Sequence, residues 1–168
     1  MTKYQYAAYG SNLHPLRLSR RVSSAKLLGT DFVDSWVLRF NKKSDIDGSA
    51  KCNIANGGDG LYVAVYEIDL SEKSRLDRIE GLGCGYQETT ICVPGYGDCW
   101  IYQAEEHAID ESLQPVDWYK EMVMLGCRYH GFPIGYLSQI EAIQAYSDRD
   151  EKRRRDEWKL VELLRNDA

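Results

Sequence analysis

The stretch YAAYGSNL, from Tyr6 to Leu13, begins as a strand and ends in a tight turn. Its first part is apolar and aromatic, which favours extended structure, whereas Gly10, Ser11 and Asn12 all favour turns. Glycine allows a ligand to approach the main chain, and successive N–H groups in a turn can hold an anion or a carbonyl oxygen. The stretch therefore predicts a strand over residues 4–9, followed by either a simple tight turn or a binding loop.

Strand patterns dominate the first two thirds of the chain. The clearest is LYVAVYEI at residues 61–68, which follows the turn signal NGGDG. Two segments separated by the turn PGYG, at residues 86–93 and 99–104, predict a β-hairpin. Further strands are expected at residues 36–40 and 51–55.

Helical patterns come mostly later. One short helix is predicted with Ser71 as its N-cap and with Gly81 or Gly83 at its end. After Pro115 the apolar residues recur at helical spacing. This spacing predicts helices at residues 118–129, 134–146 and 158–164. Strands followed by helices indicate an α+β fold with a curled or barrel-like sheet, in a single domain over residues 1–168.

Composition limits the function classes. The chain has 168 residues, 43% of them hydrophobic and 28% charged, with a net charge of -5. It shows no secretory leader pattern and no apolar run long enough to span a membrane, so we expect a cytoplasmic protein without a membrane partner. The mild acidity argues against a nucleic-acid partner. We interpret the basic run at residues 152–155, which has acidic neighbours, as a solvated helix face.

Several kinds of site are not indicated. The five cysteines form no CxxC pair, so free thiols are expected, and His14, His107 and His130 lack metal-ligand spacing. No motif signals a nucleotide loop or a hydrolase serine. We therefore predict no metal and no organic cofactor. Cys84, which lies between two glycines, stays open as a nucleophile, although no partner base is visible.

Glu80 is the most informative ionisable residue. It follows Leu76 by four residues on the predicted short helix and therefore shares that residue's apolar face. A carboxylate directed toward a core costs free energy unless it is paired or used. Two interpretations follow: Glu80 is a general acid/base, or it is a helix-end residue that leans into solvent or bridges an arginine.

Three segments together resemble the γ-glutamylcyclotransferase family, whose fold is also called AIG2-like. They are YAAYGSNL, the segment VAVYEIDLSEKSRLDRIEG at residues 63–81 with Gly85-Tyr86 beyond it, and PVDWYKEMVMLGCRYHGFP at residues 115–133. They occur in family order and span most of the chain. The resemblance implies a small mixed β-barrel with flanking helices, which agrees with the predicted order of elements.

The resemblance also implies roles for single residues. Glu80 becomes the catalytic acid/base, and the loop and two later tyrosines become the binding site for a small-molecule γ-glutamyl substrate. The implied substrate-binding residues are Tyr9, Gly10, Ser11, Asn12, Leu13, Tyr86 and Tyr119. The implied reaction is a lyase-type cyclisation that releases 5-oxoproline and an amino acid or amine.

Alternatives stay open at this point. Glutathione-specific members typically have a YGSL loop, so Asn12 argues against that branch. A γ-glutamylamine cyclotransferase, an enzyme that removes γ-glutamyl groups in a biosynthetic pathway, and a non-catalytic binding module of the same fold all remain. A homodimer is also left open.

Overall fold

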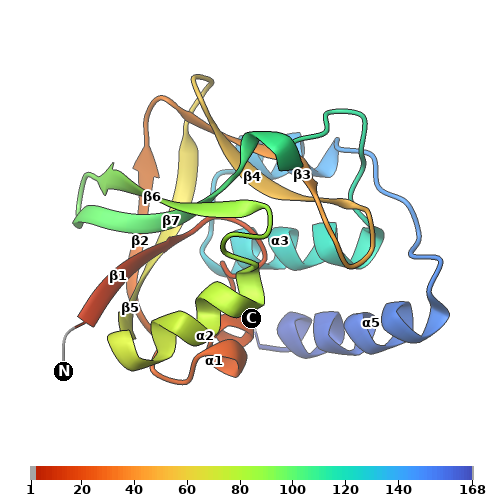
Figure 1. The fold of residues 1–168 in the computed structure, drawn as a ribbon, viewed down its shortest axis with the longest axis horizontal. Coiled ribbons are helices and arrows are strands. Elements are labelled where there is room, and N and C mark those ends of the chain that lie inside the picture. Colours follow the sequence, from red (N-terminus) through yellow and green to blue (C-terminus); the bar gives the residue numbers. More distant parts are fainter. Residues whose placement is uncertain (1–2, 168) are drawn as a thin grey trace.

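The predicted first strand lies at the centre of the larger sheet in the computed structural model, which describes residues 3–167. Strand β1 (Lys3–Ala8) pairs antiparallel with β5 (Leu61–Asp69) and parallel with β7 (Gly97–Ala104). Strand β2 (Lys26–Val33) flanks β5, and β6 (Tyr86–Val93) pairs antiparallel with β7. The order β2-β5-β1-β7-β6 is visible in Figure 1 and confirms the predicted hairpin.

A smaller sheet consists of β3 (Trp36–Lys43) and β4 (Ala50–Asn56), which are antiparallel. Where β4 approaches β7, the side-chain oxygen of Asn53 accepts a hydrogen bond of 2.7 Å from the main-chain N–H of Ala104. A side-chain hydrogen bond therefore stands where a ladder of main-chain hydrogen bonds would join the two strands. For this reason the described strands form two separate sheets. The α+β class is therefore confirmed, but the sheet is not closed and the term barrel applies loosely.

The helices lie around the two sheets (Figure 1). Helices α1 and α2 pack together near one end of the larger sheet, and α5 packs against α3. The α-helices are α1 (Pro15–Arg21), α2 (Leu70–Glu80), α3 (Asp117–Tyr129), α4 (Ile134–Glu141) and α5 (Glu151–Arg165), and a short 3₁₀ helix covers Glu106–Ala108.

The sequence predictions failed at some helix ends and at two whole elements, since neither α1 nor β2 was expected. Asp69, and not Ser71, is the N-cap of α2, because this helix begins directly after β5 and Ser71 lies inside its first turn. Gly81 ends α2 with a φ of 78°, as predicted. Helix α4 ends at Glu141, earlier than expected, and α5 begins at Glu151, earlier than expected.

Other expectations concern cysteines, surface charge and membrane spans. All five cysteines are free thiols, as predicted. Within the basic run, Arg153 pairs with Asp148 at 2.6 Å and Arg154 bonds the hydroxyl of Ser147. None of the described helices is both long and apolar enough to cross a membrane.

Candidate active site

The turn after β1 is fixed from behind by α3. The main-chain N–H of Leu13 donates to the carbonyl of Gly10 at 3.0 Å, which closes the turn. The carbonyl of Leu13 accepts a 2.6 Å hydrogen bond from the Tyr66 hydroxyl and lies 2.7 Å from His130 Nε2. A Cβ at Gly126 of α3 would come within 2.5 Å of the Leu13 Cβ, so glycine permits this close approach. The fully buried Leu13 thus anchors the turn.

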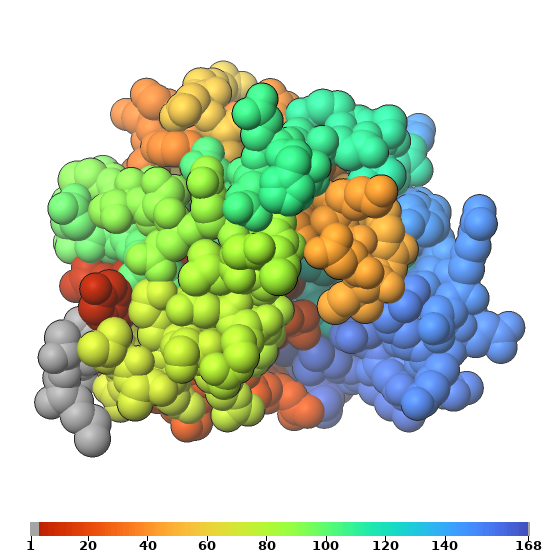
Figure 2. All heavy atoms as spheres, viewed as in Figure 1, coloured from red at the N-terminus to blue at the C-terminus, as the bar shows by residue number. Residues whose placement is uncertain are grey.

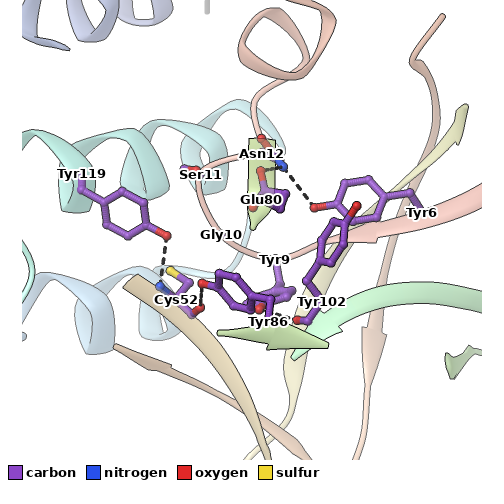
Figure 3. A pocket seen from close by; sticks show the side chains of 10 residues that line it. All are labelled: Tyr6, Tyr9, Gly10, Ser11, Asn12, Cys52, Glu80, Tyr86, Tyr102 and Tyr119. Atoms are coloured by element: carbon purple, nitrogen blue, oxygen red, sulfur yellow. Dashed lines mark hydrogen bonds between the residues drawn. The ribbon is translucent and has the colours of Figure 1, made fainter. Parts of the chain in front are cut away.

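Within the described chain, the residues of the turn have unpaired main-chain donors and line a pocket. The N–H groups of Gly10, Ser11 and Asn12 have no acceptor among residues 3–167, although Ser11 and Asn12 are buried. These residues line the pocket shown in Figure 3. Because unpaired buried N–H groups are rare, three in succession indicate a binding surface for an oxygen or anion.

Glu80 points into the same pocket from the last turn of α2 (Figure 3). Its side chain is 16% exposed, and its Oε1 accepts hydrogen bonds from Asn12 Nδ2 at 2.9 Å and from Arg21 Nη1. Its Oε2 has no partner among the residues that the structure describes. One carboxylate oxygen is therefore held in place and the other is available to a ligand.

Arg21 and Asn12 together position this carboxylate. Arg21, in the last turn of α1, also donates to Asn12 Oδ1 at 2.9 Å, while Asn12 Nδ2 donates to the hydroxyl of Tyr6 at 3.1 Å. The Asn12 side chain is thus used to hold Glu80. Glu80 therefore pairs with an arginine, as one of the two interpretations expects, and it also lies in the pocket.

Five tyrosines form most of the remaining described wall of the pocket. Burial raises the pKa of each phenol, so all stay protonated at neutral pH and retain a hydrogen to donate. Three of these hydroxyls donate to protein acceptors. Tyr9 donates to the Tyr102 carbonyl and Tyr86 to the Cys52 carbonyl. Tyr102 donates to the Asp77 carboxylate. The hydroxyls of Tyr6 and Tyr119 accept hydrogen bonds, which leaves their own hydrogens for a ligand.

Cys52 of β4 forms the floor beneath Gly10. Its N–H donates to the Tyr119 hydroxyl at 3.0 Å, and its carbonyl accepts from Tyr86 at 2.5 Å. A Cβ at residue 10 would lie 2.9 Å from the Cys52 Cβ, so glycine is required by space here. Burial raises the pKa of the Cys52 thiol to about 12, which makes it a poor nucleophile.

The pocket brings together most of the residues predicted from the sequence. Leu13 does not line it, and contributes by anchoring the turn. The predicted residues that line it are Tyr9, Gly10, Ser11, Asn12, Glu80, Tyr86 and Tyr119.

Four residues at this site were missed. Tyr6, Cys52 and Tyr102 line the pocket, and Arg21 bonds Glu80 from behind. Tyr6 lies in the opening stretch, but Tyr6, Ala7 and Ala8 are all buried, so no alternation along β1 marks Tyr6 as a pocket residue. No sequence pattern connects Arg21 with Glu80, which lies 59 positions later.

The remaining candidates lie elsewhere. Cys84 is exposed and does not line this pocket. His14 is buried, and its Nδ1 caps α1 by accepting from the N–H of Leu16. His130 binds the Leu13 carbonyl, and His107 is 74% exposed in its side chain. Within the described chain, no group of His, Cys, Asp and Glu could hold a metal ion.

Comparison with known proteins identifies similar sequences. The model of the AIG2-like family matches residues 60–140. Gamma-glutamylcyclotransferase of Bos taurus is 27% identical over 151 residues, which cover 84% of this chain and 79% of the relative. The resemblance to this family is confirmed. The Homo sapiens protein of the same name is 26% identical over the same shares of both chains.

Solved structures establish the fold further. A gamma-glutamyl cyclotransferase structure superposes with a TM-score of 0.79 at 22% identity, covering 96% of this chain and 99% of the other. An uncharacterized protein from Homo sapiens superposes with a TM-score of 0.78, also at 22% identity and with the same coverage. The sheets and helices described above are therefore those of a γ-glutamylcyclotransferase-like fold.

Proposed function

We propose that this protein is a γ-glutamylcyclotransferase, which converts a γ-glutamyl amide to 5-oxoproline and a free amino acid or amine. One observation carries the proposal. A carboxylate with a free oxygen, that of Glu80, and three unpaired main-chain N–H groups line one small pocket. A proton-transfer group and an oxyanion site are what an acyl transfer at an amide carbonyl needs.

The substrate carries its own nucleophile. The α-amine attacks the γ-carbonyl carbon, a new C–N bond closes the five-membered lactam, and the original amide C–N bond breaks. At neutral pH the α-amine, with a pKa of about 8, is mostly ammonium and must first lose a proton. Glu80 Oε2 accepts that proton and returns it to the leaving nitrogen. The attacking nitrogen loses a second proton when the lactam closes, and this proton also ends on the leaving amine, which departs as an ammonium, so no proton is gained or lost overall.

The loop and tyrosines stabilise the intermediate. Negative charge that develops on the γ-carbonyl oxygen is met by the main-chain N–H groups of residues 10–12. The hydroxyl hydrogens of Tyr6 and Tyr119 are further donors for the α-carboxylate. Holding the α-amine near the carbonyl matters as much, because well-oriented intramolecular reactions reach effective molarities of about 10⁵–10⁸ M.

The test separates cyclisation from hydrolysis, since both release the same amine. A panel of γ-glutamyl amino acids and amines is incubated with the protein in ¹⁸O-labelled water, and products are identified by mass. We expect 5-oxoproline without label, and no reaction of a substrate whose α-amine is acetylated. Labelled glutamate as the first product would show that water is the nucleophile and would exclude this mechanism.

The same panel addresses the alternatives. A non-catalytic binding module would release no amine from any member. A thiol enzyme that used Cys84 would lose its activity in Cys84→Ser, whereas the Glu80-dependent reaction should survive this substitution.

A further inference from the structure

An outer groove continues the pocket toward solvent. Ser11, Glu80, Tyr86 and Tyr119 line both, so the two are connected at the catalytic carboxylate. Figure 2 shows the surface hollowed between the segment near residue 80 and the loop near residue 45. If the γ-glutamyl half of a substrate fills the inner pocket, its leaving half extends into this groove.

The groove is positively charged on a negatively charged protein. Six basic and four acidic side chains line it among the described residues, an excess of two positive charges, whereas the whole chain has a net charge of -5. The acidic residues are Asp45, Asp47, Glu80 and Glu157. The basic residues are Arg17, Arg21, Lys42, Lys51, Arg78 and Arg153.

Three of the basic residues are already neutralised by carboxylates. Lys51 pairs with Asp47 at 2.7 Å, and Arg153 pairs with Asp148 at 2.6 Å. Arg21 pairs with Glu80. Among the others, Arg78 is exposed to solvent.

Arg17 and Lys42 are different because both are buried. Arg17 is 9% exposed and Lys42 is 5% exposed, and neither pairs with a carboxylate among residues 3–167. Arg17 Nε has no hydrogen-bond partner, and Lys42 Nζ lies 4.8 Å from the ring centre of Tyr86. A buried charge without a partner is costly, so the Arg17 guanidinium is incomplete without an anion, and the Lys42 ammonium has only the face of the Tyr86 ring as its partner in the described chain.

The electrostatic surroundings of Arg17 keep it charged. Burial, together with the nearby Arg21, lowers its pKa to about 10, although Glu157 and Glu80 oppose this change. It is a cation at neutral pH. Glu157 makes no direct ion pair with it, so the Nε remains available.

We propose that this groove binds a leaving half that carries two carboxylates, and that Arg17 and Lys42 select it. The inference rests on the proposed function. The γ-glutamyl half carries one ammonium and one carboxylate and adds no net charge, so Arg17 and Lys42, which have no carboxylate partner in the described chain, are left to face the leaving half. The preferred substrate class is therefore an acidic amino acid in γ-glutamyl linkage, rather than a neutral amino acid or an amine.

The kinetic test varies charge on the leaving half at nearly constant shape. The substrates are γ-glutamyl-glutamate, γ-glutamyl-glutamine and γ-glutamyl-glutamine α-amide, whose leaving halves carry two, one and no carboxylates. We expect kcat/KM to fall about tenfold at each step, mainly through KM, because a charge-assisted contact is lost each time. Added salt should reduce these differences. Equal kcat/KM for all three would overturn the inference.

Variants assign the preference to the two cations. In Lys42→Gln and in Arg17→Gln, at least one of the two tenfold differences in kcat/KM between the substrates should disappear. Arg17→Lys, which keeps the positive charge, should retain part of the difference that Arg17→Gln loses. Arg155→Gln, an exposed arginine of α5 outside the groove, is the matched control for loss of one positive charge. Thermal unfolding of each variant shows whether it is folded. Unchanged selectivity in a folded Lys42→Gln protein would contradict the proposal even if Arg17→Gln does not fold.

A binding measurement separates this inference from the proposed function. Glutaryl-glutamate and glutaryl-glutamine lack the α-amine and cannot cyclise, and they share the glutaryl half, so the difference between their affinities in calorimetry reports the groove. Tighter binding of glutaryl-glutamate that is lost in Lys42→Gln supports the groove even if no substrate gives 5-oxoproline, in which case the proposed function fails. Release of 5-oxoproline together with equal binding of both ligands means that the function stands and the groove inference is wrong.

Discussion

The inner pocket and the outer groove meet at Glu80 but differ in how their polar groups are satisfied. The pocket has a volume of about 20 Å³ and is walled by tyrosines whose hydroxyls bond the protein. The groove has a volume of about 400 Å³ and holds buried cations without carboxylate partners. Preorganised neutral donors suit a reaction centre, whereas uncompensated charge suits recognition of an ionic group. Chemistry and selectivity are thus expected to reside in different side chains.

Glu80→Gln is the change that should damage the pocket most. The amide keeps the shape but cannot accept the ammonium proton, so we expect turnover to fall about 10²–10⁴-fold. The measurement is 5-oxoproline release at saturating substrate, with circular dichroism as a check of the fold. Near-normal turnover in a folded variant would remove Glu80 from the mechanism.

Gly10→Val should come next, because it fills the space between the loop and β4. The added Cβ would lie 2.9 Å from the Cys52 Cβ, and the backbone of β4 is held there by Tyr86 and Tyr119. We expect kcat/KM to fall by about 10²-fold, since the donors at residues 10–12 move away from the oxyanion.

The matched control for that change is Gly135→Val on α4. A Cβ at Gly135 meets no heavy atom within 4 Å, so this variant tests loss of a glycine without a clash. Similar losses in both variants would mean that the effect of Gly10→Val is not specific to the pocket.

The sequence predicted the pocket better than its surroundings, for physical reasons. The turn at residues 10–12 and the apolar-face position of Glu80 are local features that a short stretch encodes. Helix α1 has seven residues, too few to show a period, and Gly29 interrupts the pattern of β2. The groove could not be predicted. Arg17 and Lys42 are buried without a carboxylate partner in the described chain because of the segments that fold around them, and a short stretch of sequence does not show which segments these are.

Asp148→Asn should lower stability while sparing the pocket. Asp148 is buried, and Arg153, followed by Trp118, lowers its carboxyl pKa to about 2. A lowered pKa in the folded state stabilises the fold above about pH 4, and this contribution is lost as the pH falls toward 2. We expect a loss of about 1–2 kcal/mol in unfolding free energy at pH 7.

Urea unfolding of both proteins at several pH values measures this loss. The difference between them should shrink between pH 4 and pH 2, with kcat at pH 7 changed by less than about threefold. A difference that stays constant down to pH 2 would show that the carboxylate charge is not what stabilises this part of the molecule.

Ser11→Ala should have the smallest effect, although Ser11 lines both the pocket and the groove. Its main-chain N–H has no acceptor in the described chain, and alanine retains this N–H while removing the hydroxyl. If recognition is through the main chain, kcat/KM should change by less than about threefold.

The decisive companion is replacement of residue 11 by lactic acid, which differs from Ser11→Ala in having an ester oxygen in place of the N–H. That protein should lose about 10²-fold, the usual effect of removing one oxyanion donor. The opposite result is a large loss of kcat/KM in Ser11→Ala and little further loss in the ester. It would assign recognition to the hydroxyl and would remove the main-chain oxyanion site from the mechanism.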